Sequence, residues 1–170
     1  MKAYQKVEFA SNILIIVVSL ILGVILVQKY FLAPSKTLSR PNQIDPVIGS
    51  KVNLPDMAWS PQSKTLILAM QTGCHFCNES MPFYKRLIEA TKDKNIKLVA
   101  VFPTSVEDST AHLDSLGIKN LEVKQMPLTN IQVRGTPTLI LTNSDGEILN
   151  FWVGKLPPEK EAEVIDKLSS

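Results

Sequence analysis

The sequence predicts an α/β domain, with a central mixed sheet flanked by helices, joined to an N-terminal transmembrane helix. Three observations support this prediction. Nineteen residues from Phe9 to Val27 contain no charge. Short apolar, β-branched runs alternate with amphipathic segments through the middle of the chain, which is typical of a layered domain whose first strands are parallel. Two further apolar runs surround a turn near the C-terminus, which predicts a hairpin before a last helix.

The N-terminal helix is predicted over residues 9–32, after a flank of residues 1–8. A helix of this length roughly matches a hydrocarbon core of about 30 Å. A cleaved signal peptide is the alternative, but the apolar segment is long for one, and Ala33, the small residue near its end, is followed by Pro34. We therefore expect an uncleaved anchor in the lipid bilayer.

The orientation of the anchor does not follow from charge, because lysines both precede and follow the apolar segment. A single N-terminal helix before a long domain usually acts as a signal anchor. We therefore expect a single-pass membrane protein whose domain lies on the extracytoplasmic side.

Residues 33–46 are predicted to be a linker, because they hold three prolines among polar residues and have no apolar period. The domain is expected over residues 47–170. It has 13 Lys and Arg against 14 Asp and Glu, a net charge of −1, and no basic stripe. We expect no nucleic acid partner.

The first half of the domain alternates strand and helix. Apolar runs over residues 65–70 and 96–102 predict two buried strands. Between them, residues 75–92 have helical spacing. The apolar side chains expected on one side of this helix are Phe76, Phe83, Leu87 and Ile88.

The second half begins with a helix that Thr104 or Ser105 can cap and that Gly117 ends. A short strand is expected near residues 121–123, followed by a loop through Pro127.

Residues 137–154 then predict a hairpin around a turn at residues 143–146. A last amphipathic helix is expected over residues 156–168, with a proline in its first turn. Its inward side chains would be Val164, Ile165 and Leu168.

The chain has two cysteines, Cys74 and Cys77, at the junction of the first buried strand and the following helix. Open α/β sheets place their sites at this edge. The unpaired N–H groups of a helix start favour a thiolate, so we expect the pKa of Cys74 below its ordinary value of about 8.5. The spacing puts both sulfurs on one side of the first turn. Cys74 would attack a partner's disulfide, and Cys77 would then resolve the mixed disulfide.

Two other interpretations of the cysteine pair stay open. One is a metal site. Zinc usually needs four ligands, however, and the chain offers no second cysteine pair; its two histidines are His75 and His112. The other is two inert cysteines or a structural disulfide, although a bridge that closes so small a loop stabilises little. We favour a redox centre with no metal and no cofactor.

A second motif, VRGTPTLIL, places Pro137 sixty residues after Cys77. With this motif the sequence resembles the thioredoxin superfamily over about residues 50–169. The resemblance implies a redox-active CxxC at Cys74 and Cys77, a helix proline at Pro82 and a cis-proline at Pro137. A cis bond there would leave the backbone of Thr136 free to pair with an extended substrate peptide.

The chain is similar to one group within that superfamily. The 33 residues between Pro103 and Pro137 exceed those of a plain thioredoxin and resemble the insertion of TlpA-like proteins and peroxiredoxins. The N-terminal helix favours the membrane-anchored TlpA-like thiol-disulfide oxidoreductases.

Several positions depart from the thioredoxin pattern. Gly73 stands where Trp is usual, and His75 with Phe76 replaces the usual Gly-Pro. The buried acid of thioredoxins would fall near Leu68, so that proton acceptor is missing. Glu79 is a candidate for proton transfer, or a glutamate that the helix dipole favours.

His75 has two interpretations of its own. A protonated imidazole beside Cys74 could stabilise the thiolate, whereas a neutral one would simply be exposed.

The resemblance predicts an enzyme, a thiol-disulfide oxidoreductase that exchanges electrons with exported cysteine-containing proteins such as apocytochrome c. One helix cannot carry reducing equivalents across a bilayer, so the electron donor would be a separate membrane thiol transporter. A thiol peroxidase is one alternative, but Gln71 stands where peroxiredoxins favour Thr or Ser. A redox-inert chaperone or assembly factor is the other.

Overall fold

The computed structural model describes residues 16–19, 21–22, 45–55, 57–59, 63–92 and 94–168. The chain divides into two compact units, residues 1–42 and 43–170. In the first unit, residues 16–19 and 21–22 are helical. Within the described ranges, no helix has the length and apolar character needed to cross a bilayer. Most of the predicted anchor (9–32) and of the predicted linker (33–46) lies outside the described residues.

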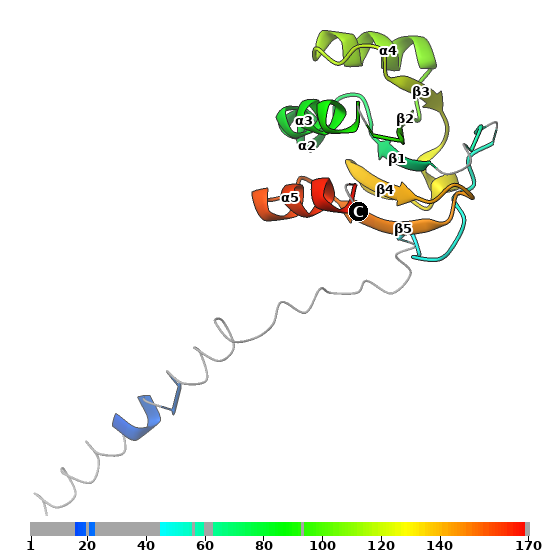
Figure 1. Cartoon of the computed structure of the whole chain (residues 1–170). Coiled ribbons are helices and arrows are strands. Elements are labelled where there is room, and N and C mark those ends of the chain that lie inside the picture. The colour runs from blue at the N-terminus through cyan, green and yellow to red at the C-terminus, as the bar shows by residue number, and fades with distance from the viewer. Residues whose placement is uncertain are drawn as a thin grey trace, which may run out of the picture. The chain divides into compact units, whose positions relative to one another are not determined.

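The second unit is built on a five-stranded mixed sheet in the order β3-β2-β1-β4-β5 (Figure 1). Strand β1 pairs in parallel with β2 and antiparallel with β4; β2 pairs in parallel with β3, and β4 and β5 form the predicted hairpin. The strands are β1 (Lys64–Ala69), β2 (Ile96–Phe102), β3 (Glu122–Gln125), β4 (Thr138–Thr142) and β5 (Ile148–Val153).

Helices cover one face of this sheet (Figure 1). They are α2 (His75–Glu79), α3 (Met81–Thr91), α4 (Val106–Ser115) and α5 (Pro158–Lys167). Their apolar sides pack with Leu66 and Leu68 of β1 in one core, to which α3 contributes Phe83 and Leu87. Alternate residues of a strand point to opposite faces, so Ile67 belongs to the other core.

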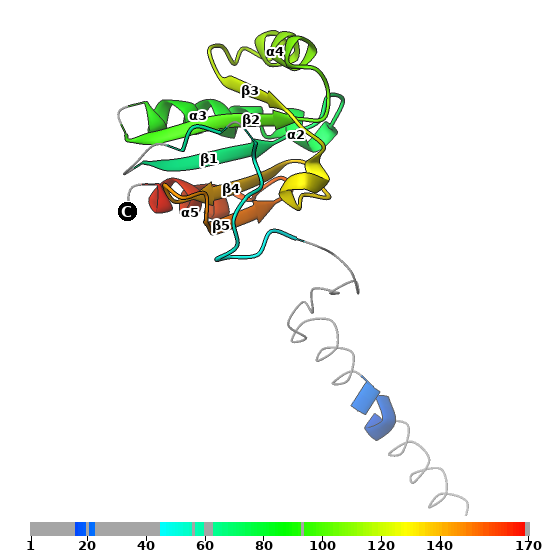
Figure 2. The same cartoon turned by 90° about the vertical axis from the view of Figure 1, so that its right-hand side faces the viewer.

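The opposite face is covered by irregular segments (Figure 2). Val52, Leu54 and Met57 precede β1, and Ile131 lies in the 3₁₀-helix η2 (Leu128–Ile131); all four pack in the second core. Both faces of β1 and β4 are therefore buried, which the continuous apolar run of residues 65–70 predicted for β1.

The single helix predicted over residues 75–92 is wrong. Two helices occupy this range, and Ser80 is the C-cap of α2 and the N-cap of α3. Pro82 lies in the first turn of α3, where no intrahelical acceptor faces its nitrogen and proline is tolerated. In one uninterrupted helix the same residue would be interior, and its missing N–H would remove a helical hydrogen bond. The break changes the helical phase, so Phe76 is 55% exposed instead of lying on the buried side with Phe83.

Two smaller differences between the predicted and the observed elements occur where the sequence signal is weak. The strand predicted near residues 121–123 is β3, Glu122–Gln125, whose side chains are exposed or half-buried and so give no apolar run. The loop predicted through Pro127 is followed by η2, a short helix that was not predicted and whose C-cap Gln132 has a left-handed backbone with φ of 58°.

Candidate active site

Cys74 and Cys77 form a disulfide just beyond the C-terminal end of β1. Their Cα atoms are 5.2 Å apart, within the usual range for a disulfide. Cys77 lies inside α2 with none of its surface exposed, whereas Cys74 is partly buried at the start of that helix. A partner sulfur can therefore reach Cys74 more easily than Cys77.

Cys74 is the N-cap of α2, in place of the usual Ser, Thr, Asp or Asn. Its extended backbone, with φ of −72° and ψ of 112°, turns the side chain toward the first turn. There the backbone N–H of Cys77 donates to Cys74 Sγ at 3.1 Å. In the reduced state the same N–H would favour a thiolate at Cys74, because helix N-termini present unpaired donors.

The loop before β4 faces this sulfur. The Thr136–Pro137 peptide bond is cis, and the carbonyl oxygen of Thr136 lies 3.4 Å from Cys74 Sγ. A disulfide sulfur carries no hydrogen, so this is a contact in the oxidised state; the reduced Cys74 thiol could donate to the same carbonyl.

Hydrogen bonds fix that loop on both sides. The Gly154 N–H donates to the Pro137 carbonyl at 2.7 Å, and Thr138 Oγ1 donates to the Gly135 carbonyl at 2.8 Å. Within the described part of the chain, the Thr136 N–H has no backbone partner. An extended peptide beside Cys74 could accept from it.

Gly73 explains one departure from the thioredoxin pattern. Its φ is 77°, a left-handed conformation that glycine adopts without strain and a tryptophan would not. No atom lies within 4 Å of the position that a Cβ would take. The backbone conformation, and not a lack of space, therefore accounts for the glycine.

His75 and Glu79 lie one helical turn apart on α2 and face each other. His75 Nε2 is 3.2 Å from Glu79 Oε1, and the His75 side chain is 78% exposed. Lys155 Nζ lies 2.9 Å from the other carboxylate oxygen. The hydrogen bond from Lys155 lowers the pKa of Glu79 below its ordinary value of 4.5, so Glu79 is ionised at neutral pH.

Leu68, near which the resemblance would place the buried acid of thioredoxins, is an apolar core residue that is 1% exposed. Among the described residues, none of the buried polar side chains is a carboxylate; those that carry a hydroxyl belong to Ser, Thr and Tyr84. Ser80 is the nearest of these to Cys77 along the chain, and its Oγ donates to the Phe76 carbonyl at 2.8 Å. Burial raises the pKa of Tyr84 on the next turn, so its phenol is neutral.

Sequence reasoning missed Lys155. It lies 76 residues from Glu79 along the chain, in the loop between β5 and α5. No local spacing signals such a pair, whereas the cysteines and the proline each stand in a recognisable motif. The structure thus brings together Cys74, Cys77, Thr136 and Pro137 in one place, and His75 and Glu79 beside them.

Comparisons with known proteins agree with this architecture. The family model described as "Thioredoxin-like domain" matches residues 56–169. A search of curated proteins gave no match.

Several solved structures share the fold. One from Chlorobium tepidum, described as the thiol:disulfide interchange protein DsbE, is 23% identical, with a TM-score of 0.58 over 74% of this chain and 98% of that one. The thioredoxin domain of a thiol-disulfide oxidoreductase from Bacteroides vulgatus is 19% identical, with a TM-score of 0.56 over 73% and 99%. StoA from Bacillus subtilis is 16% identical, with a TM-score of 0.53 over 76% and 100%.

The matched residues run from before β1 to the end of α5 and include both cysteines and the cis-proline. They make up well over half of the sequence. The chain therefore belongs to the thioredoxin-like domain family.

Proposed function

We propose that the chain is a thiol-disulfide oxidoreductase that exchanges electrons with cysteine-containing proteins through Cys74 and Cys77. One observation carries the proposal: Cys74 Sγ is reachable, accepts the Cys77 N–H at a helix start and lies 3.4 Å from the Thr136 carbonyl beside a cis-proline. A merely structural disulfide needs none of these features.

The reaction needs no group beyond the two cysteines. The Cys74 thiolate attacks one sulfur of a partner's disulfide and releases the other sulfur as a thiolate. Cys77 then loses its proton and attacks Cys74 Sγ, which releases the partner's second thiolate and closes the Cys74–Cys77 bond. Two electrons pass to the partner, which takes up two protons. The reverse sequence oxidises a partner dithiol.

Trapping and turnover together test this proposal. The full chain in detergent, reduced with dithiothreitol, should accelerate insulin reduction, and Cys77→Ser should accumulate a mixed disulfide through Cys74. Cys74→Ser should do neither. Unchanged insulin reduction by the variant that lacks both cysteines would reject the redox assignment in favour of a binding role.

We also propose that residues 9–32 anchor the chain in a membrane with the domain on the extracytoplasmic side. The uncharged run from Phe9 to Val27 supports an anchor of spanning length. Exported cysteine-containing proteins would then be the partners, and a membrane thiol transporter would supply electrons when the chain acts as a reductant.

The anchor has its own test, which is separate from the redox test. Full-length chain expressed in a bacterial host should remain in the membrane pellet after alkaline carbonate extraction. A variant without residues 1–32 should appear in the supernatant. After reduction, a maleimide that does not cross membranes should label Cys74 in intact spheroplasts; labelling only after lysis would place the domain in the cytoplasm.

A further inference from the structure

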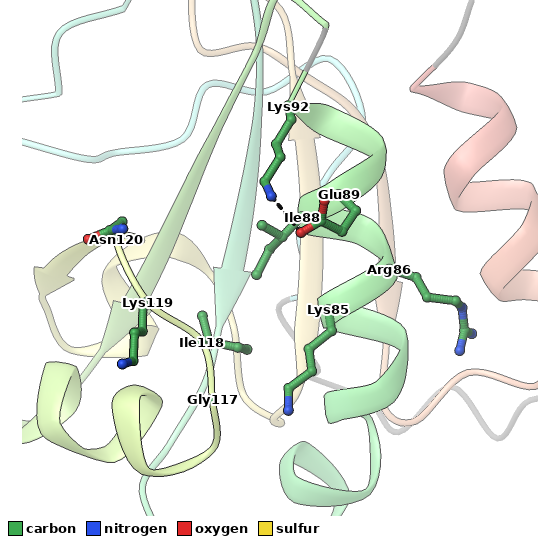
Figure 3. A pocket seen from close by; sticks show the side chains of 9 residues that line it. All are labelled: Lys85, Arg86, Ile88, Glu89, Lys92, Gly117, Ile118, Lys119 and Asn120. Atoms are coloured by element: carbon green, nitrogen blue, oxygen red, sulfur yellow. Dashed lines mark hydrogen bonds and ion pairs between the residues drawn. The ribbon is translucent and has the colours of Figure 1, made fainter.

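A groove of about 860 Å³ lies between α3 and the connection from α4 to β3 (Figure 3). Neither cysteine nor Pro137 lines it, so it is separate from the redox site. The α3 wall is formed by Lys85, Arg86, Ile88, Glu89 and Lys92, and the other wall by Gly117, Ile118, Lys119 and Asn120.

The lining carries four cations and one carboxylate. Arg86 pairs with Glu161 of α5, and Lys92 pairs with Glu89 at 2.6 Å. Neither Lys85 nor Lys119 has an ion-pair partner among the described residues. Residues 47–170 contain slightly more acidic than basic side chains, so this cluster does not reflect a generally basic domain.

The unpaired lysines belong to opposite walls of the groove (Figure 3). Gly117 has a φ of 78°, and a Cβ at this position would be 3.0 Å from Lys85 Nζ. The Lys85 ammonium group therefore lies over Gly117, against the wall that carries Lys119. Each wall also carries an isoleucine: Ile118 is 3% exposed and Ile88 is partly buried, so part of the groove lining is apolar.

We propose that this groove is a docking site for an acidic, extended segment of a partner protein. Carboxylates of that segment would bind Lys85 and Lys119, and an apolar side chain would lie against Ile88 and Ile118. Charge complementarity favours an acidic ligand. The concave shape favours a narrow peptide over a bilayer, because a flat surface would contact only the rim. The proposal does not depend on the redox chemistry of Cys74.

Peptide binding to the full chain tests this proposal. The chain is reconstituted in phosphatidylcholine nanodiscs, and a short fluorescent peptide of Glu and Asp around a central Leu is titrated in. A matched peptide has Gln and Asn at the acidic positions. We expect the acidic peptide to bind at least tenfold more tightly than the amide peptide. Its affinity should fall as the salt concentration rises, and its binding should shift the NMR signals of the amides of residues 117–120.

Two double variants separate the groove from general electrostatics. Lys85→Gln with Lys119→Gln should weaken acidic-peptide binding about tenfold, the loss expected when two exposed charge pairs are removed. Lys51→Gln with Lys64→Gln removes the same charge outside the groove and should change the affinity for the acidic peptide less than twofold. Neither pair alters a redox residue, so both should retain insulin reduction if the proposed redox function is correct.

Three results would overturn the docking proposal. The acidic and amide peptides could bind equally, or the two double variants could lose the same affinity. Alternatively, the peptide could fail to bind, while the NMR signals of the amides of residues 117–120 shift in phosphatidylglycerol nanodiscs that contain no peptide. That result would assign the lysines to the membrane surface. If the unaltered chain binds the acidic peptide but does not reduce insulin, that result would count against the proposed redox function alone.

Discussion

Cys74 and Cys77 have different environments, although only two residues separate them. Cys77 is fully buried, while Cys74 is partly exposed and accepts the Cys77 N–H. The roles of attacking and resolving cysteine follow from this asymmetry. The order of the two roles could be predicted from position at a helix start, but the depth of Cys77 depends on the core beneath α2.

The ion pair of Glu79 with Lys155 gives a pH-dependent prediction. The pair stabilises the folded chain above pH 4.5, and that stabilisation is lost as the pH falls through the lowered pKa of Glu79. Lys155→Met should raise this pKa toward 4.5, as an NMR titration of the carboxyl carbon would record. Lys160→Met is the control, because Lys160 lowers the pKa of Glu163 instead. Equal effects of both variants on Glu79 would contradict the assignment.

Gly73 gives a prediction about backbone strain. Gly73→Ala places a side chain at a φ of 77° in open space, so the cost is conformational alone. We expect a loss of about 1–2 kcal/mol in the free energy of unfolding, measured by urea denaturation. Gly135→Ala is the control, because Gly135 lacks a positive φ and a Cβ would meet only Val153 at 3.9 Å. A loss as large in the control would count against strain at Gly73.

At the scale of elements, the sequence predicts buried strands well and helix breaks poorly. β2 has the predicted bounds, 96–102, because its largely apolar run is typical of a buried strand; its last four residues are buried and its first three are half-buried. The break between α2 and α3 does not follow from the sequence, because the apolar spacing continues across Pro82. The bounds of β3 differ from the predicted residues 121–123, because a half-buried edge strand such as Glu122–Gln125 carries no apolar period.

The exposed position of Phe76 gives a prediction about element packing. Phe76→Ala should change the free energy of unfolding by less than about 0.5 kcal/mol, since Phe76 is 55% exposed. Phe83→Ala removes a ring that is 2% exposed and should cost about 3–5 kcal/mol. Chemical denaturation of both variants checks this difference. Similar losses would mean that Phe76 packs inward, as the uninterrupted helical period predicted.

At the scale of the whole molecule, the site depends on strand order. β1 and β4 are neighbours, and Ala69 pairs with Thr138. Cys74 follows one of these strands and Pro137 precedes the other, so the antiparallel pairing brings two motifs sixty residues apart to one edge of the sheet. The motifs themselves were recognisable in the sequence. The ion pair from Lys155 and the groove beside α3 were not, because both join elements that no local pattern relates.

The reactivity of the two reduced thiols tests the central claim most directly. The reduced full chain would be treated with limiting iodoacetamide over a range of pH, and each cysteine would be followed by mass spectrometry. The structure predicts that Cys74 is alkylated first, with a midpoint below the ordinary thiol pKa of about 8.5, and that Cys77 reacts slowly in the folded chain. Equal rates at both cysteines, or faster reaction at Cys77, would contradict the account.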